Sequence, residues 1–167
     1  MADGGLDRLD LALLEALRER PRAGALELSR LTRVARATVQ ARLRRLEEAV
    51  VTGYGPDIDL EAAGYPVAAF VTLEIAQGAL DRLAADLEAL PEVLEAHVTT
   101  GTYDVLCKVG ASSHQHLQET LLELTRLDAV RRSTSVVILS ELVAPRVMPL
   151  LRRSAQDRDA RAPAHRA

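Results

Sequence analysis

The stretch from residue 30 to residue 46 (RLTRVARATVQARLRRL) constrains this chain more than any other segment. It contains six arginines and no acidic residue, while Val39, Leu43 and Leu46 recur at the spacing of one helix face. A helix with one apolar edge and one cationic face fits the negatively charged surface of duplex DNA. Taken alone, the pattern is equally consistent with a solvated basic face on an ordinary helical domain.

The segments around this stretch favour one of these interpretations. Leucines at helical spacing predict a first helix that Asp7 caps, with Asp10 completing a capping box, and that ends near Pro21. A short second helix is expected over residues 25–32, followed by a tight turn and a third helix over residues 36–49. A short helix, a tight turn and a basic helix form a helix-turn-helix, which favours DNA binding.

Projecting the third helix at about 100° per residue separates residues that can read bases from residues that can hold phosphates. Opposite the apolar edge, Arg44 has the geometry to bind a guanine and Gln40 an adenine. Ala37 and Ala41 are small enough to approach a thymine methyl. Thr38 and the flanking arginines are expected to hold phosphates. The predicted DNA-binding residues are Arg36, Ala37, Thr38, Gln40, Ala41, Arg42, Arg44 and Arg45.

Charge is distributed unevenly along the chain. The net charge of -3 combines +2 over residues 1–55, -8 over residues 56–146 and +3 over residues 147–167. An acidic average therefore does not exclude nucleic acid as a partner. The single cysteine excludes an internal disulfide framework. With no apolar run near the roughly 18 residues of a membrane span, and no signal peptide, we expect a cytoplasmic protein without a membrane partner.

After Pro66 the hydrophobic period changes from helical to alternating. Strands are expected near residues 67–76, 93–100, 105–109 and 130–143, with one leucine-rich helix after the first strand and another after the third. The order βαββαβ is the ferredoxin-like unit, in which helices cover one face of an antiparallel sheet. The other face still carries apolar residues, so we expect a second subunit to cover it.

These patterns predict an α+β protein with four segments. Residues 1–52 form the helix-turn-helix domain, and residues 53–66 (GYGPDIDLEAAGYP) form a linker in which a short strand can form. Residues 67–145 form the second domain. Residues 146–167 form a basic tail that lacks apolar periodicity from about residue 154, so we expect it to be disordered.

Several runs of sequence resemble the Lrp/AsnC (feast/famine) transcriptional regulators. They are Leu9–Leu14, Glu27–Ser29, Thr38–Glu47 and Val51–Tyr54, within a resemblance that covers residues 6–143. It implies a winged or plain helix-turn-helix domain and a linker that helps to pair subunits. It also implies a RAM domain, which resembles ACT domains and assembles into dimers and often octamers. The implied function is a homo-oligomeric, DNA-binding transcriptional regulator.

Three positions depart from the pattern of that family. Ala35 stands where serine usually caps the recognition helix, Gly24 where serine usually opens the preceding helix, and Arg33 where the turn usually holds glycine. Arg33 has to adopt a positive φ, which is unfavourable for a residue with a Cβ atom. An alanine cap is weaker than serine by roughly 0.5–2 kcal/mol. These changes bear on the turn and on one phosphate contact, and they leave the basic face intact.

The run from Gly101 to Asp104 matches the G-x-Y-D loop of the family. The resemblance implies that this loop contributes to an amino-acid effector site between subunits. Asp104 can accept an ammonium group, while backbone amides hold a carboxylate. The alternative is a tight turn shaped by Gly101 and Asp104 alone. The predicted effector residues are Gly101, Thr102, Tyr103, Asp104 and, as a weaker candidate, Thr134.

The sequence shows no catalytic or metal motif, and no cofactor is expected. His97 beside Glu95 is interpreted as a surface or interface residue, and Cys107 as part of the core. His114 and His116 point to different helix faces, a poor arrangement for a metal. Two alternatives stay open: an enzyme like the siroheme decarboxylases, which resemble this family and need a histidine-rich porphyrin pocket, and an amino-acid-binding assembly module without DNA binding.

Overall fold

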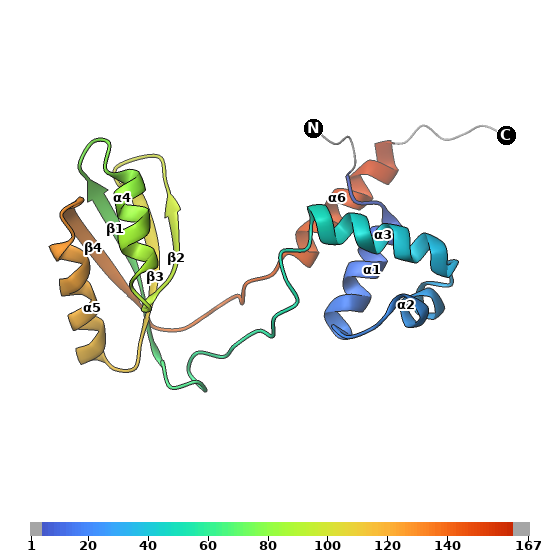
Figure 1. The fold of residues 1–167 in the computed structure, drawn as a ribbon, viewed down its shortest axis with the longest axis horizontal. Helices are drawn as coiled ribbons and strands as arrows, with labels where there is room; N and C mark the ends of the chain where they lie inside the picture. The colour runs from blue at the N-terminus through green and yellow to red at the C-terminus, as the bar shows by residue number, and fades with distance from the viewer. Residues whose placement is uncertain (1–4, 162–167) are drawn as a thin grey trace. The chain divides into compact units, whose positions relative to one another are not determined.

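A computed structural model describes residues 5–161 of the chain, with side chains up to residue 156. The chain forms two compact units: the part up to Pro56 together with the segment from Ala144 onward, and the part between them. No described helix is long and apolar enough to cross a membrane. The helices are α1 (Arg8–Glu19), α2 (Ala25–Thr32), α3 (Arg36–Ala49), α4 (Leu80–Glu88), α5 (His114–Arg126) and α6 (Met148–Arg161), and the strands are β1 (Val67–Ile75), β2 (Val93–Val98), β3 (Val105–Ala111) and β4 (Val130–Ile138) (Figure 1).

The first unit packs α1, α2 and α3 around a small aliphatic core. The predicted capping box is confirmed: the Asp10 amide donates to Asp7 and the Asp7 amide donates to Asp10, each at 2.9 Å. α1 then ends at Glu19, just before Pro21. No strand accompanies these helices among the described residues, so the helix-turn-helix has its plain form. The buried core residues are Leu13, Leu17, Leu28, Val39 and Leu46.

The turn between α2 and α3 is held without a glycine. Arg33 adopts the left-handed conformation with φ of 56°, as its place in the turn predicted. Ser29 stabilises the turn twice, because its hydroxyl donates to the Val34 carbonyl at 2.7 Å and its carbonyl accepts from the Val34 amide at 3.2 Å. Ala35 provides no side-chain cap for α3. Ser29 therefore supplies part of the stability that a glycine turn and a serine cap would give.

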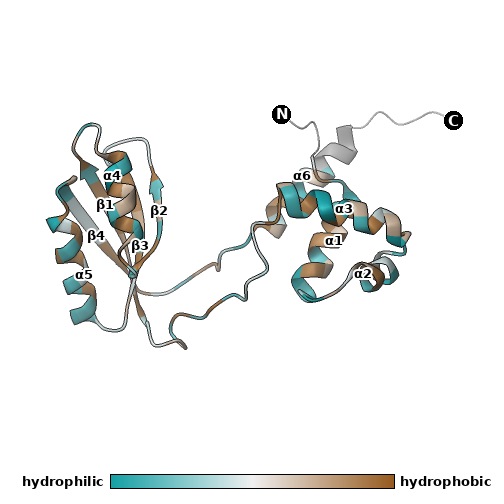
Figure 2. Cartoon of the chain, in the orientation of Figure 1, coloured by the Kyte–Doolittle hydropathy of each residue, from teal (hydrophilic) through white to brown (hydrophobic). Residues whose placement is uncertain are grey.

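The second unit is an antiparallel sheet in the order β2-β3-β1-β4. Alternate residues of β1 and β3, such as Val71, Leu73 and Cys107, are buried against Leu83 of α4 and Leu124 of α5. Both helices therefore cover the same face, and the predicted ferredoxin-like order is confirmed (Figure 1). Colouring by hydropathy shows the apolar character of the inner strands (Figure 2).

The last expected strand is shorter than predicted, and the short strand that could form in the linker is absent, for the same physical reason. β4 ends at Ile138 instead of residue 143, because its pairing with β1 ends where Ile138 faces Ala68. The linker over residues 53–66 contains a turn in which the Tyr65 amide donates to the Leu60 carbonyl at 2.7 Å, and it contains no strand. A strand needs a neighbour for its backbone hydrogen bonds, and the described residues provide none at either place.

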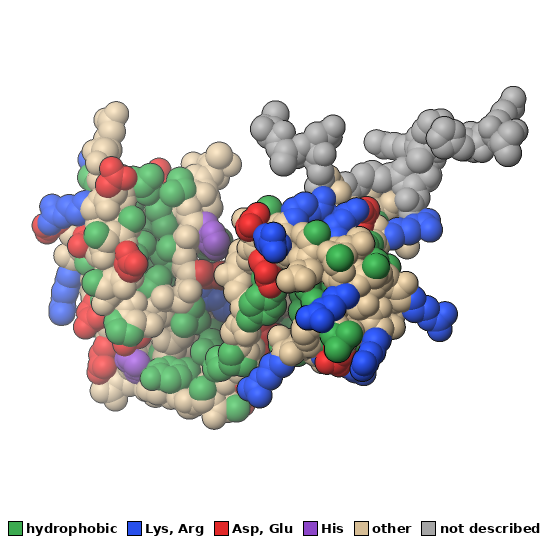
Figure 3. Space-filling model, turned by 45° about the vertical axis from the view of Figure 1, so that its right-hand side comes forward, with side chains coloured by type: hydrophobic (Ala, Val, Ile, Leu, Met, Phe, Trp, Pro, Cys, Tyr) green, Lys and Arg blue, Asp and Glu red, His purple; other side chains and the backbone are tan. Residues whose placement is uncertain are grey.

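The face of the sheet opposite the helices stays partly apolar. Phe70 on β1 and Val136 on β4 face each other across the sheet and are 39% and 64% exposed. Beyond β4, Leu139 and Leu142 are almost fully exposed. A space-filling view shows hydrophobic side chains gathered on the surface of this unit (Figure 3). Their cover by a second subunit stays a prediction.

The expected disorder of residues 146–167 is wrong over most of the segment. Residues Met148–Arg161 form α6, and its Met148, Leu151 and Ala155 pack with Leu11 of α1. Their spacing of three and four residues makes one apolar stripe on the helix. Residues 162–167 of the expected tail lie outside the described part of the chain.

Candidate nucleic-acid interface and effector loop

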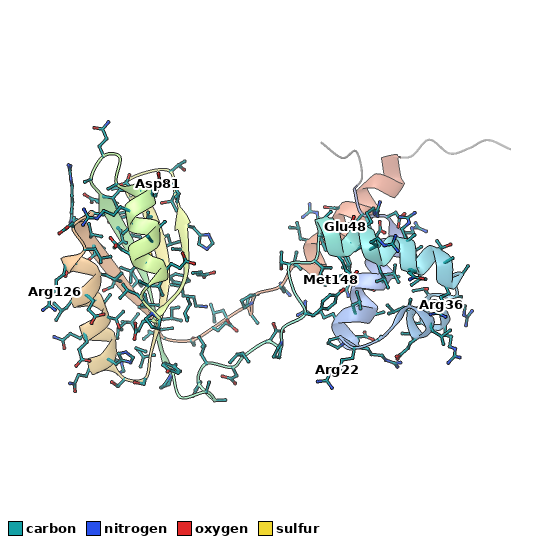
Figure 4. The ribbon with its side chains drawn as sticks, viewed as in Figure 1. Arg22, Arg36, Glu48, Asp81, Arg126 and Met148 are labelled. Carbon is teal, nitrogen blue, oxygen red and sulfur yellow. The ribbon has the colours of Figure 1, made fainter. Side chains whose placement is uncertain are left out.

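α3 buries one edge and exposes the opposite side, as its projection predicted. Val39 and Leu46 are fully buried in the core of the first unit. The exposed side carries the residues proposed to read bases, together with Arg36 and Thr38. Figure 4 shows Arg36 at the beginning of α3, at the outer edge of the helices. The exposed members of the predicted set are Arg36, Ala37, Thr38, Gln40, Ala41, Arg44 and Arg45.

Two of the predicted phosphate contacts have partners inside the unit. Arg42 on α3 donates from Nη1 to Asp7 Oδ2 at 2.5 Å and to the two Asp10 carboxylate oxygens at 3.1 and 3.3 Å. Arg45, one helix turn further, also donates to Asp10. Asp10 is fully buried, so it is a charged group held between α1 and α3. Sequence reasoning assigned Asp10 to capping alone and missed this second role, because its arginine partners lie on another helix.

The remaining basic residues of the exposed face are not neutralised in this way. Among the described residues, neither Arg36 nor Arg44 pairs with a carboxylate. Arginine side chains stand out over the surface of this unit in the space-filling view (Figure 3). The structure therefore divides the arginines of α3 into two that bind Asp10 and two that pair with no carboxylate of the described residues.

The ion pairs shift the ionisation of both partners. Burial opposes the shift for Asp7, but hydrogen bonds from the Asp10 amide and from Arg42 hold the pKa of Asp7 below its usual value. The hydrogen bond to Asp7 raises the pKa of Arg42. Because the Asp7 pKa is lower in the folded unit, its contribution to stability is present above the usual carboxyl pKa of about 4. It is lost as the pH falls through the lowered value.

The beginning of the linker is attached to the end of α3. The Tyr54 hydroxyl donates to Glu47 Oε1 at 2.9 Å. Burial and, after it, the neighbouring Glu47 carboxylate raise the pKa of Tyr54. Both residues belong to the runs that carry the family resemblance, which gives that pattern a physical meaning. The hydrogen bond therefore ties Tyr54 of the linker to the last turn of α3.

The G-x-Y-D loop lies against the end of β1. Gly101 has a φ of 114°, which a residue with a side chain rarely adopts. The Asp104 amide donates to the Leu73 carbonyl at 3.0 Å, and Asp104 Oδ2 accepts from the Ile75 amide at 2.8 Å. The Thr99 hydroxyl donates to the Tyr103 carbonyl at 2.9 Å. Asp104 thus shapes the turn, as the alternative interpretation held, while its second carboxylate oxygen makes no hydrogen bond to a described residue.

The other effector candidates are less concentrated. Gly101, Thr102 and Asp104 are exposed, whereas Tyr103 is half-buried. Thr134 is exposed on β4 and faces Thr72 of β1 across the sheet. The structure therefore brings the loop residues together at one end of β1 and places Thr134 on the neighbouring strand.

The cysteine and two of the histidines that were considered for catalysis are either buried in the core or paired with neighbouring side chains. Cys107 is fully buried, and burial raises its pKa to about 11, which keeps it a thiol. His97 lies 3.5 Å from Glu95 on an exposed part of β2. His116 accepts from the Ser112 amide at 3.2 Å and lies 3.1 Å from Glu92, so it connects the start of α5 to the β2 side. No cluster of three metal-binding side chains exists in the described part of the chain.

Comparison with protein families divides the chain at similar places. A model of the AsnC-type helix-turn-helix domain matches residues 6–47, and a model of the Lrp/AsnC ligand binding domain matches residues 68–148. Among curated proteins, the chain is similar to the regulatory protein AsnC of Escherichia coli, with 30% identity over 148 residues, 86% of this chain and 97% of that protein. It is also 29% identical to the HTH-type transcriptional regulator FL11 of Pyrococcus horikoshii, over 80% of this chain and 89% of that one.

Solved structures show the same similarity. E. coli AsnC superposes with a TM-score of 0.79 at 28% identity, covering 86% of this chain and 99% of that chain. A transcriptional regulator from Neisseria meningitidis, solved as a complex with L-Met, has a TM-score of 0.75 at 26% identity. That match covers 83% of this chain and 93% of that chain.

The buried carboxylate provides a test of how α3 is held. Replacing Asp10 by alanine removes the capping box and the partner of Arg42 and Arg45, so we expect the first unit to lose about 2–4 kcal/mol of unfolding free energy. Urea unfolding of the full chain, followed by circular dichroism, measures the loss. Glu48→Ala is the control, because Glu48 is an exposed carboxylate on α3, the helix that Asp10 binds (Figure 4). We expect this variant to change the unfolding free energy by less than about 0.5 kcal/mol. Equal stability of the two variants would show that Asp10 does not hold α3.

Proposed function

The chain belongs to the Lrp/AsnC family of transcriptional regulators, and we propose that it binds duplex DNA with the exposed side of α3 under the control of an amino acid bound at the Gly101–Asp104 loop. One observation carries the first half of this proposal. The exposed side of α3 carries no acidic residue from Arg36 to Arg45, its acids Glu47 and Glu48 lie in its last turn, and a buried carboxylate of α1 binds the helix. Such a face binds the DNA backbone electrostatically and can place side chains in the major groove.

The contacts within the first unit assign different roles to its arginines. Arg44 and Gln40 are proposed to contact base edges, with the small Ala37 and Ala41 allowing close approach. Arg36 and Thr38 are proposed to hold phosphates. Arg42 and Arg45 are proposed to act first as positioning residues through Asp10. Their side chains are 33% and 45% exposed, so they can also lie near the DNA backbone.

This assignment predicts different consequences for two kinds of variant. Replacing both Arg36 and Arg44 by alanine should weaken specific DNA binding about ten- to a hundredfold and lower its salt dependence, while leaving stability nearly unchanged. Arg42→Ala should mainly reduce stability, because it leaves Asp10 with one partner. The measurement is salt-dependent binding to DNA that flanks the protein's own gene.

Arg22→Ala is the matched control, since Arg22 is exposed in the turn between α1 and α2, away from the face described above (Figure 4). DNA affinity equal to that of the wild type in the Arg36, Arg44 double variant would remove this face from the DNA interface. It would favour the assembly module that does not bind DNA.

The second half of the proposal concerns the loop at the end of β1. Gly101 is exposed, has a positive φ and carries no side chain that would cover the backbone, and one carboxylate oxygen of Asp104 makes no hydrogen bond to a described residue. An amino acid offers an ammonium and a carboxylate, which suit a carboxylate and free amides respectively. The regulator from Neisseria meningitidis that was solved with L-Met supports an amino acid as the class of effector. We propose that this site is completed in a homodimer or a larger oligomer, formed through the apolar open face of the sheet.

Asp104→Asn tests the effector site while preserving the fold. The asparagine carbonyl can still accept from the Ile75 amide, whereas the charge that would bind an ammonium is lost. We expect the change in DNA affinity caused by an amino acid to require about tenfold or more of that amino acid, with unchanged DNA binding in its absence. The twenty amino acids are tested singly, and Asp81→Asn on the exposed start of α4 is the control. A wild-type response in the Asp104 variant would exclude the loop as the ammonium site.

A further inference from the structure

The helix α6 has a specific seat on the DNA-binding unit. Met148 and Ala155 are each 7% exposed and pack against Leu11 of α1, with Leu151 beside them. Arg152 Nε donates to Glu15 Oε1 at 2.5 Å, next to this contact. Leu11 is 8% exposed and belongs to the cluster with α6, not to the buried cluster that forms the core of the unit. The family model of the second domain ends at residue 148, so almost all of α6 lies beyond both matched segments.

α1 connects this seat to the recognition helix. Leu11 touches α6, while the preceding residue, Asp10, binds Arg42 and Arg45 of α3. Leu14 packs both in the core cluster and in the cluster with α6. α6 is therefore connected to α3 through α1 and its buried ion pair, without an intervening loop.

The chain enters and leaves the second unit through two connections that both end on the first unit. Residues 50–66 begin at the end of α3, and residues 139–147 run from β4 to α6. In the first connection Tyr54 is hydrogen-bonded to Glu47 and residues 60–64 form a turn, which leaves residues 55–59 between them. An extended segment of that length spans up to roughly 17 Å, about half a turn of DNA. Alone it would let the helix-turn-helix adapt to many positions. The second connection reaches at most about 30 Å and is fixed on α1 by α6.

We propose that α6 is a second anchor of the DNA-binding unit, which fixes how far apart two recognition helices are held and thereby sets the spacing of the half-sites that the protein accepts. This inference rests on the proposed function, because spacing has a meaning only for a dimer that binds DNA. Leu11, Leu151 and Asp10 are positioning residues in this device and contact no base. With α6 released, each unit keeps its own core and the first unit keeps its DNA-binding face. The two units are then held together by the first connection alone.

Two leucines that are neighbours in α6 make a matched pair of variants. Leu151→Glu places a charge in the contact with α1, whereas Leu150→Glu places the same charge on a side chain that is 66% exposed. Hydrogen exchange of the full-length protein reports docking directly, because an isolated helix of this length is marginal in water. Protection of the amides between residues 148 and 156 should fall about tenfold or more in Leu151→Glu and stay unchanged in Leu150→Glu. Leu151→Ala serves as a milder variant if the glutamate impairs folding.

The accepted spacing is tested by measuring the affinity for two DNA fragments. The first is a fragment that the wild type binds, and the second is the same fragment with five base pairs, about half a turn, inserted between its half-sites. The wild type and Leu150→Glu should lose about tenfold or more in affinity on insertion, and Leu151→Glu less than about threefold. If Leu151→Glu loses the exchange protection of α6 but still discriminates between the two fragments as the wild type does, the anchor proposal is overturned and the proposed function is not. Full exchange protection of α6 in Leu151→Glu would have the same consequence. Failure of the wild type to bind any fragment would overturn the proposed function and the anchor together.

Discussion

The DNA-binding unit depends on the ion pairs between the buried carboxylate of Asp10 and two arginines of α3. A buried charge is tolerated only when it is paired and hydrogen-bonded. Asp10 meets this requirement with two arginines from α3 and with the backbone amide of Asp7. The same requirement fixes the rotation and position of α3 relative to α1. A helix-turn-helix whose turn lacks glycine and whose recognition helix lacks a serine cap is thus held by a contact outside the turn.

This contact also explains why a helix with so many arginines is stable as part of a small unit. Arg42 and Arg45 would repel the other arginines of α3 if their charge were not balanced. α1 supplies that balance, whereas Arg36 and Arg44, which we propose contact DNA, pair with no carboxylate among the described residues. α1 is therefore the central element of the unit: its core face packs α2 and α3, its first turn binds α3, and its outer face carries α6.

Local sequence patterns predicted much of this fold, because most elements are fixed by their own periodicity and caps. The helix bounds of α2 and α3, the capping box at Asp7, and the alternation of β1 and β3 all follow from neighbouring residues. The features that were missed depend on partners far along the chain. Asp10 binds arginines 32 and 35 residues away, and α6 is ordered by contact with α1. β4 is shorter than its pattern because strand length is set by the neighbouring strand.

The same distinction applies to the candidate sites. The exposed side of α3 could be read from helical projection, since burial of Val39 and Leu46 determines it. The projection could not show that two flanking arginines have partners inside the unit. The loop motif likewise could not show that one carboxylate oxygen of Asp104 accepts from the Ile75 amide. Both are tertiary contacts, and both change the role that residue type alone suggested.

The claim that α3 reads DNA sequence through Arg44 is tested most directly by combining this residue with base changes in a bound fragment. Affinities of the wild type and of Arg44→Ala are measured for each single base-pair substitution in the recognised site. Loss of about 1–3 kcal/mol of discrimination in the variant, at one G·C pair in each half-site and at no other position, is the expected result. Unchanged discrimination at every position would contradict base reading by Arg44 and leave it as a phosphate contact.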